Sequence, residues 1–257
     1  MDVNNDKILT IETKCYEKDW KLILTKSRLN KVFNRCHVTN AKKVIYINNV
    51  LDRLRVEKRV SKLKAKKLID EYYFVEDYEL EVLNFFNLNR ESFTSGYHYS
   101  IQELTGIYLC DTPYLLHFAG DCILNKIDSH KWIENSIKIL NSENKFIVAN
   151  ASWERTFEGP KLESISEVNG FFVGQGFSDQ CYLIKVSDFR KSIYCYTHSE
   201  SERYPKYGGE LFEKRVDAYM RVQNKYRLTS NNAVYNHLNV PNSKFGLISR
   251  FIFHRDY

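Results

Sequence analysis

The chain has 257 residues, 43% of them hydrophobic and 27% charged, and a net charge of +6 at pH 7. This length can form one large α/β domain or two small ones, and the composition is that of a globular protein, which excludes fibrous and disordered chains. The mildly basic balance suits an anionic ligand, a nucleic acid or an anionic membrane surface, without choosing among them. The first residues, MDVNNDKILT, lack the pattern of a signal peptide, and no apolar run is long enough to span a membrane, so we expect a cytoplasmic protein.

The first 150 residues alternate between short apolar runs and amphipathic segments. Strands are predicted over residues 8–11, 44–47, 72–75, 114–118 and 146–149, and helices over 17–36, 51–68, 78–86, 99–109 and 132–140. This alternation is typical of a mostly parallel central sheet flanked by helices. The second half is more mixed, with strands predicted over 171–173, 181–184 and 228–234 and a helix over 210–222. No linker rich in proline or glycine interrupts the chain, so we expect a single domain over residues 1–257.

The six cysteines, at positions 15, 36, 110, 122, 181 and 195, form no CxxC pair and have no regular spacing. In a chain of this size that pattern favours reduced cysteines in the core over a disulfide framework or a zinc site.

Polar residues follow several of the predicted strands at the point where each strand ends. They are Glu12-Thr13, Asn48-Asn49, Glu76-Asp77 and Gly120-Asp121. Any one of them is compatible with an ordinary turn residue. In an open parallel sheet, however, ligands bind at the carboxyl ends of the strands, so their recurrence at the same edge favours a binding crevice.

Asp121 lies at the tip of the strand in YLLHFAGDCIL. A carboxylate in this place can hold a Mg²⁺ or Mn²⁺ ion that bridges phosphate oxygens, and Gly120 lets a diphosphate approach the backbone closely. The alternative is a Gly-Asp turn that ends the strand. His237, in NAVYNHL, would complete a mixed oxygen and nitrogen metal site with Asp121, although a lone histidine is more often a structural hydrogen-bonding residue.

Two carboxylates, Glu210 and Glu213, fall at the start of the predicted helix in KYGGELFEKRV. One of them could act as a general base on an acceptor hydroxyl, although acidic residues at a helix start also simply favour the helix dipole. Gly208 and Gly209 precede them and predict a loop that orders on binding. Trp153 is either a platform for a sugar ring or an ordinary half-buried side chain.

Residues 53–67 carry eight Lys or Arg residues against one Glu. The apolar residues of this segment share one helix face, which favours a solvated helix surface. Binding of nucleic acid and contact with an anionic membrane are the two alternatives.

Taken in chain order, these segments resemble the GT-A nucleotide-sugar glycosyltransferases of the inverting family-2 type. ILTIETKCY is similar to their first strand and VIYINNVLDR to their second. SIQELTGIYLCDTPYLLHFAGDCIL resembles the passage that ends in their Asp-x-Asp metal motif, with Ala119 in the place of the first Asp and Asp121 in that of the last. YGGELFEKRV is similar to their Glu-Asp helix, with Glu213 followed by Lys214, and His237 matches their His after the last strand.

The resemblance implies a GT-A-like (Rossmann-like) fold with a nucleotide-binding half, 1–125, and an acceptor-binding half, 126–257. It implies donor contacts at Glu12, Thr13, Asn48, Asp52, Tyr97, Ser100, Gly120 and Asp121, and acceptor contacts at Trp153, Gly208 and Gly209. Asp121 and His237 would hold a divalent cation, Mn²⁺ or Mg²⁺, and Glu213, or else Glu210, would be the catalytic base.

The implied activity is transfer of a sugar from a nucleotide-diphosphate sugar to a hydroxyl of a glycan or lipid-linked acceptor. The resemblance also implies inversion and a role in surface polysaccharide synthesis. The basic charge of residues 53–67 leaves peripheral contact with the inner face of the membrane as an option. Because Ala119 and Lys214 replace two acids of the family pattern, a catalytically inactive module that binds a sugar nucleotide is the alternative. A nucleic-acid-binding protein is a further alternative, but we do not expect a nucleic acid as partner.

Overall fold

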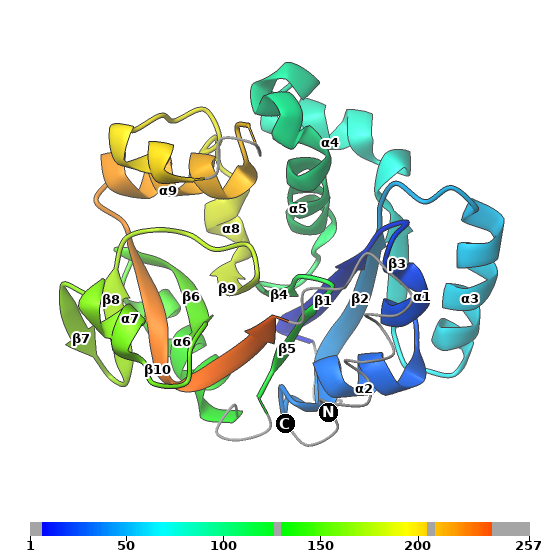
Figure 1. Cartoon of the computed structure of the whole chain (residues 1–257), viewed down its shortest axis with the longest axis horizontal. Helices are drawn as coiled ribbons and strands as arrows, with labels where there is room; N and C mark the ends of the chain where they lie inside the picture. Colours follow the sequence, from blue (N-terminus) through cyan, green and yellow to red (C-terminus); the bar gives the residue numbers. More distant parts are fainter. Residues whose placement is uncertain (1–6, 126–129, 205–208, 238–257) are drawn as a thin grey trace, which may run out of the picture.

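A computed structural model gives the structure of the chain, which is described here for residues 7–125, 130–204 and 209–237 (Figure 1). Within these residues ten strands form one sheet in the order β3-β2-β1-β4-β9-β6-β10-β8-β7, with β5 paired to β10. The strands are β1 (Leu9–Cys15), β2 (Ala41–Ile47), β3 (Glu71–Phe74), β4 (Tyr114–Phe118), β5 (Cys122–Leu124), β6 (Phe146–Ser152), β7 (Ser166–Val168), β8 (Phe171–Gly174), β9 (Cys181–Lys185) and β10 (Tyr226–His237).

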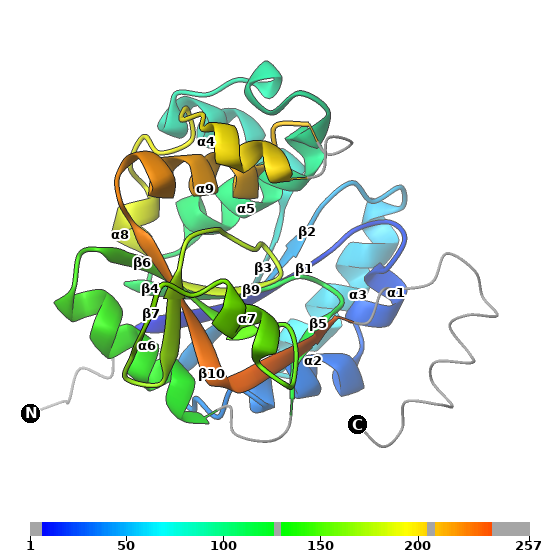
Figure 2. The ribbon, with the colours of Figure 1, turned by 60° about the vertical axis from the view of Figure 1, so that its left-hand side comes forward.

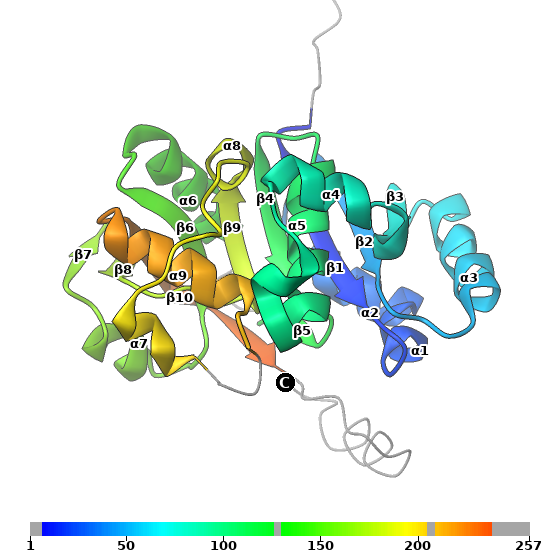
Figure 3. The ribbon, with the colours of Figure 1, turned by 90° about the horizontal axis from the view of Figure 1, so that it is seen from above.

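Helices cover both faces of the sheet. They are α1 (Trp20–Ile23), α2 (Lys26–Asn34), α3 (Arg53–Ala65), α4 (Glu79–Phe86), α5 (Tyr97–Leu109), α6 (His130–Ser142), α7 (Glu158–Leu162), α8 (Val186–Phe189) and α9 (Phe212–Val222), with 3₁₀ turns η1 (Val75–Asp77), η2 (Arg90–Gly96) and η3 (Ser199–Arg203). Helices α1, α2, α3 and α6 bury apolar side chains in the core on one face, and α4, α5, α8 and α9 do so on the other (Figures 2 and 3). The sheet is therefore the middle layer of three.

The direction of the strands changes along the sheet. Strands β3, β2, β1 and β4 are parallel, whereas β9 runs antiparallel to both β4 and β6, and β10 runs parallel to β6. The predicted α/β fold, with a parallel first half and a mixed second half, is confirmed. Because of these directions, the carboxyl ends of β1, β2, β4, β6 and β10 and the start of β9 all lie at one edge of the sheet.

Several predicted elements have different limits in the structure, and three of these differences bear on the site. The first strand continues to Cys15 instead of ending at residue 11. The helix predicted over 17–36 is broken, because the Thr25 side chain accepts a hydrogen bond from the backbone N–H of Arg28 and starts α2 as a new helix. The helix predicted from residue 210 begins at Phe212, so Glu210 precedes α9 and Glu213 lies in its first turn.

All six cysteines are free, and five of them are buried, as expected for reduced core residues, whereas Cys195 is exposed and does not fit that expectation.

The basic helix α3 packs one apolar side against the sheet, through Val56, Val60 and Leu63. Two leucines at its start, Leu51 and Leu54, are 87% and 80% exposed beside its basic surface. Among the described residues no helix is long and apolar enough to cross a membrane. Contact of this helix with an anionic membrane stays a prediction.

Candidate functional site

Five polar side chains from five separate segments gather at the carboxyl edge of the sheet. They are Lys14 at the end of β1, Asp121 in the turn between β4 and β5, Asp179 just before β9, Glu213 in the first turn of α9 and His237 at the end of β10. Asp179 interacts electrostatically with Lys14, Glu213 and His237, and His237 contacts Asp121. The carboxyl edge of the sheet, where the polar strand ends were expected to gather, therefore carries a cluster of ionisable groups.

A buried arginine fixes the turn that presents Asp121. The guanidinium of Arg28 donates to the carbonyl oxygens of Gly120, at 2.7 Å, and Cys122, at 3.1 Å. A Cβ atom at residue 120 would lie 2.6 Å from the carbonyl oxygen of Lys14, so only glycine fits where the turn passes β1. Asp121 is thus a turn residue, and its carboxylate remains 20% exposed at the edge.

Asp121 and His237 form an ion pair, with 3.0 Å between Oδ2 and Nε2. Burial alone would raise the pKa of Asp121, but the hydrogen bond and the charge of His237 outweigh it and lower this pKa below its usual value. The same hydrogen bond raises the pKa of His237. The antiparallel pairing of β5 with β10 brings the two residues together, because it sets His237 opposite Cys122.

The Asp121–His237 pair offers ligand atoms that could hold a divalent cation. The ligand atoms of Asp121, Cys122 and His237 lie within 4.8 Å of one another, and a carboxylate with an imidazole suits Mn²⁺. The Cys122 thiol is not a ligand, because burial raises its pKa well above the usual value and its Sγ donates to the side chain of Gln180. Ala119 has no ligand atom, so the chain offers two protein ligands here.

Glu213 has the environment of a general base. Burial, and next the nearby carboxylate of Asp179, raise its pKa to about 8, although the backbone N–H of Asp179 donates to it and Lys14 lies close. Glu210 is different, because its carboxylate pairs with Lys214 at 2.8 Å and with Arg215 at 3.2 Å. Glu213 lies beside Asp179 and forms no salt bridge with the other described residues, whereas Glu210 forms two.

A polar row crosses the sheet directly behind this edge. Glu12, His117 and Tyr182 are aligned on β1, β4 and β9, and all three are buried. His117 Nδ1 and Glu12 Oε1 are 2.7 Å apart, and the His117 and Tyr182 rings stack with their centroids 4.6 Å apart. Glu103 on α5 accepts from the Tyr182 hydroxyl at 2.7 Å and forms a salt bridge with Lys14.

The predicted donor contacts Glu12 and Thr13 lie inside this part of β1, at 1% and 0% exposure. The strand that was expected to end before them continues past them. Burial raises the pKa of Glu12 and lowers that of its partner His117, so the pair is accommodated without two full charges. The edge is instead formed by Lys14 and the residues after it.

We expect removal of the Glu103 charge to destabilise the fold strongly. Glu103 is 1% and Lys14 15% exposed, and breaking a buried ion pair leaves an uncompensated charge, so Glu103→Gln should cost about 3–5 kcal/mol. The matched control is Glu71→Gln, which breaks the exposed pair with Lys64 and should cost less than about 1 kcal/mol. Urea unfolding of both variants measures the difference, and equal losses would contradict the structural role of Glu103.

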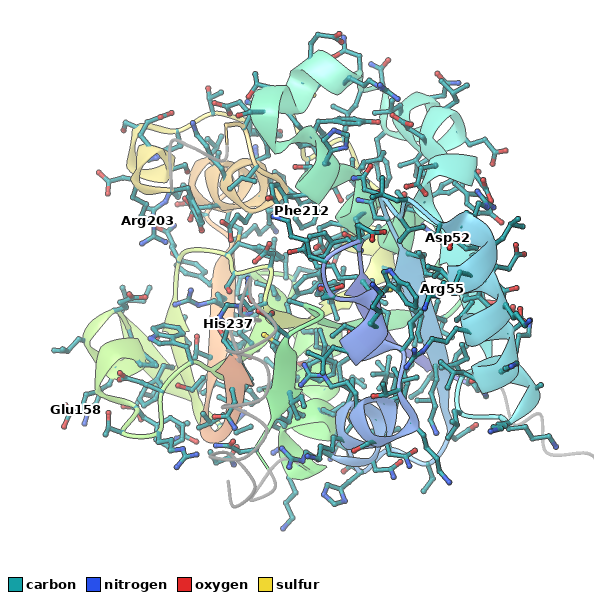
Figure 4. All side chains as sticks on the ribbon, turned by 45° about the vertical axis from the view of Figure 1, so that its right-hand side comes forward. Asp52, Arg55, Glu158, Arg203, Phe212 and His237 are labelled. Atoms are coloured by element: carbon teal, nitrogen blue, oxygen red, sulfur yellow. The ribbon has the colours of Figure 1, made fainter. Side chains whose placement is uncertain are left out.

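Two more predicted donor residues, Asn48 and Asp52, follow β2. Asn48 is buried and its side chain donates to the carbonyl oxygen of His98 at 2.8 Å. Asp52 caps α3, because its carboxylate accepts from the backbone N–H of Arg55, and it is exposed on the side of the molecule that Figure 4 shows at the right. The Asn48 side chain is therefore enclosed, whereas the Asp52 side chain is open to a ligand.

Tyr97 and Ser100 lie on α5 and are both buried. The Tyr97 hydroxyl donates to Glu79, and the Ser100 hydroxyl donates to the Gly96 carbonyl at 2.9 Å. Ser100 also accepts from the backbone N–H of Phe212 at 2.9 Å and so fixes the start of α9. Glu213 follows Phe212 directly, so the hydrogen bond from Phe212 to Ser100 helps to hold Glu213 against the edge of the sheet.

The predicted acceptor residues Trp153 and Gly209 lie in different places, Trp153 after β6 and Gly209 beside the turn Thr94–Gly96. Trp153 follows β6, is 37% exposed and carries the guanidinium of Arg227 over its ring at 5.4 Å. Gly209 has φ +64°, and a Cβ atom there would clash with the Thr94 side chain, so glycine is required. Gly208 lies outside the described residues.

The sequence did not single out Asp179, Lys14 or Asp19. Asp179 lies in the loop GQGFSDQ, and only the antiparallel pairing of β9 with β4 brings it to the edge. Asp19 directly precedes α1, and its carboxylate accepts from the backbone N–H of Tyr16 at 2.8 Å; burial, assisted by the charge of Asp121, raises its pKa to about 7. A pattern of local strand ends could not have revealed residues whose placement depends on non-local pairing.

Comparison with known proteins supports the same architecture. No protein-family model matches the sequence, and no curated protein does. Among solved structures, a UDP-glucose pyrophosphorylase with UDP-glucose is similar, with a TM-score of 0.53, 10% identity, and coverage of 96% of this chain and 99% of that one. The structure of GalNAc-T7 with UDP, GalNAc and Mn²⁺ has a TM-score of 0.52 and 8% identity, over 91% of this chain and 44% of that one. The chain therefore spans less than half of the GalNAc-T7 structure.

These similarities establish the fold: the chain has the GT-A-type α/β architecture that its sequence predicts.

Proposed function

We propose that the protein is a glycosyltransferase that moves a sugar from a nucleotide-diphosphate sugar to a hydroxyl of a glycan or lipid-linked acceptor. Inversion at the anomeric carbon and a role in surface polysaccharide synthesis are parts of the same proposal. The observation that carries it is the convergence of Glu213 and the Asp121–His237 pair at the carboxyl edge of a GT-A-type sheet. Ligands of open α/β sheets bind at this edge.

The chemistry is an in-line displacement at the anomeric carbon. The Glu213 carboxylate takes the proton of the acceptor hydroxyl, whose oxygen forms the new glycosidic bond while the bond to the diphosphate oxygen breaks. Asp121 and His237 would hold a divalent cation, and that cation would neutralise the negative charge on the leaving diphosphate. Lys14 lies close enough to Glu213 to favour its ionised form.

The two similar structures support a uridine nucleotide as the first donor to test, since UDP or UDP-glucose is bound in both. The pyrophosphorylase structure also suggests a second candidate, transfer of a nucleotidyl group to a sugar phosphate, because that chain is matched over 99% of its length. The two reactions release different products, UDP in one case and pyrophosphate in the other.

We expect the protein to release UDP from one member of a panel of UDP-sugars in the presence of Mn²⁺ and a mixed panel of saccharide acceptors. Mass spectrometry identifies the glycosylated product, and a coupled assay of UTP with sugar 1-phosphates measures pyrophosphate. Pyrophosphate formation without UDP release would favour the second candidate. Binding of UDP-sugars without hydrolysis or transfer across the panel would instead make the protein a catalytically inactive binding module.

A further inference from the structure

A cavity of about 350 Å³ lies on the α9 side of the sheet, away from the cluster at the carboxyl edge. It is lined by Glu163, Ile165, Gln175, Arg203, Arg221 and Tyr226. These residues come from the segment before β7, the loop after β8, η3, the end of α9 and the start of β10. In Figure 4 Arg203 lies on the same side of the molecule as Glu158 of α7, opposite Asp52 and Arg55.

Two arginines, Arg203 and Arg221, line this cavity, and a third, Arg227, forms an ion pair with its lining residue Glu163. Arg203 and Arg227 approach each other at Gly176, where a Cβ atom would clash with the Arg203 guanidinium and come within 3.2 Å of Nη1 of Arg227. Arg221 reaches the same loop and faces Gln175, with 3.4 Å between Nη1 and Oε1. Gly176 has φ +103°, a backbone conformation that leaves room for the two guanidinium groups.

The carboxylates next to these arginines do not balance them. Buried Asp217 accepts from Nε of Arg221 at 3.0 Å and also faces Nη2 of Arg203 at 3.8 Å, so one carboxylate serves two cations. Arg227 has Glu163, at 3.2 Å, and Glu163 is 50% exposed. In the part of the chain that the structure describes, these three guanidinium groups thus pair with two carboxylates.

Arg227 is the most buried of the three arginines, and one of its donors is unpaired within the described part of the chain. Its side chain is 6% exposed, and its buried Nε has no hydrogen-bond partner among the described residues. A buried cation with an unused donor is costly unless an anion pairs with it. Its guanidinium lies over the half-exposed ring of Trp153, the aromatic residue that the sequence singled out for a sugar.

The cavity and the proposed base are joined by one rigid element. Glu213 lies in the first turn of α9 and Arg221 in its last, and eight residues of helix place them about 12 Å apart along the axis. This separation is comparable to the length of a saccharide of a few units.

We propose that this cavity binds an anionic group, a carboxylate or a phosphate, on the acceptor saccharide. The anion would complete the charge balance of Arg203, Arg221 and Arg227 and accept paired hydrogen bonds from the planar guanidinium groups. That the anion belongs to the acceptor rests on the proposed glycosyltransferase function, whereas the binding of the anion itself does not.

The test is calorimetric titration of the full chain, without nucleotide, with glucuronic acid, glucose 6-phosphate and glucose. Both anionic sugars should bind at least about tenfold more tightly than glucose, because hydrogen bonds to charged groups are the stronger ones. The tighter of the two anionic sugars identifies the preferred anion. Equal binding of all three sugars would overturn the proposal.

Two variants at the cavity should have opposite effects. Arg203→Gln removes a half-exposed cation and should weaken binding of the anionic sugars about tenfold, and Glu163→Gln removes the competing carboxylate and should strengthen it. Arg55→Gln, the same change on the far side of the molecule, is the matched control and should have no effect. An unchanged affinity in Arg203→Gln would contradict the assignment.

The outcomes for the cavity and for the proposed function are separable. If Arg203→Gln changes nothing while wild-type UDP release continues, only the anion site is refuted. If the anionic sugars bind as expected but no UDP-sugar is turned over, the anion site stands and the glycosyltransferase proposal fails.

Discussion

Replacing Glu213 by Gln is expected to lower sugar transfer by about 10²–10⁴-fold while leaving the affinity for UDP unchanged, which is the range that general-base catalysis contributes. The amide keeps the size of the side chain and can still accept from the backbone N–H of Asp179, but it cannot take a proton. Single-turnover rates with the identified UDP-sugar and calorimetric titration of UDP measure the two quantities separately.

Glu210→Gln is the matched control for this variant. Glu210 lies just before α9 and pairs with Lys214 and Arg215, so its charge is already used. We expect transfer to stay within about threefold of the wild type, since a partly exposed ion pair contributes little. A normal rate in Glu213→Gln together with a lost rate in Glu210→Gln would show that the base assignment is wrong.

The pH dependence of transfer gives a second signature of the same residue. Burial and the neighbouring Asp179 raise the pKa of Glu213 from 4.5 to about 8. A base must be ionised, so the transfer rate should rise with pH and reach half its maximum near pH 8.

A carboxyl group whose pKa is higher in the folded chain binds more protons there, so its contribution to stability falls as the pH rises from about 4.5 to about 8. Glu213→Gln should remove that loss, which urea unfolding at pH 5 and pH 9 measures.

The alternation of strands and helices was predictable because burial on both sides of a parallel strand produces an uninterrupted apolar run. Tyr114–Phe118, which is apolar except for His117, has the predicted limits. The turn that follows it was predictable too, since Gly120-Asp121 is a local signal. Even the partnership of Asp121 with His237 was reached from the sequence, through the order of motifs along the chain.

The first strand shows why the positions of the site residues were harder to predict than the strands and helices. Its polar residue Glu12 looks like the end of a strand, yet the fold buries it because His117 and Tyr182 occupy the matching positions of β4 and β9. The register that brings these three side chains together joins segments more than 100 residues apart in the chain. The same non-local pairing places Asp179 beside Glu213, and no local pattern encodes it.

Replacing Asp121 by Asn is expected to lower the affinity for UDP in the presence of Mn²⁺ by about 100-fold or more. Loss of a residue that only supports a metal ligand already costs 10–100-fold in metal affinity, and Asp121 is proposed as the ligand itself. The carboxylate is 20% exposed, and Arg28 holds the turn through backbone carbonyls, so the variant should fold, with the thermal midpoint lowered only by the loss of the ion pair with His237.

The metal separates two explanations of that loss. If Asp121 holds the ion, chelation with EDTA should weaken UDP binding by the wild type but not by Asp121→Asn, because the variant has already lost the Mn²⁺-dependent share. If Asp121 acts only by keeping His237 protonated, and so positively charged toward the diphosphate, EDTA should weaken both proteins equally or neither. His237→Gln should follow the pattern of Asp121→Asn with a smaller loss, because one of the two ligands remains. Undiminished UDP binding in Asp121→Asn would show that the diphosphate does not meet the β4–β5 turn, and the donor site would then have to be sought elsewhere along the edge.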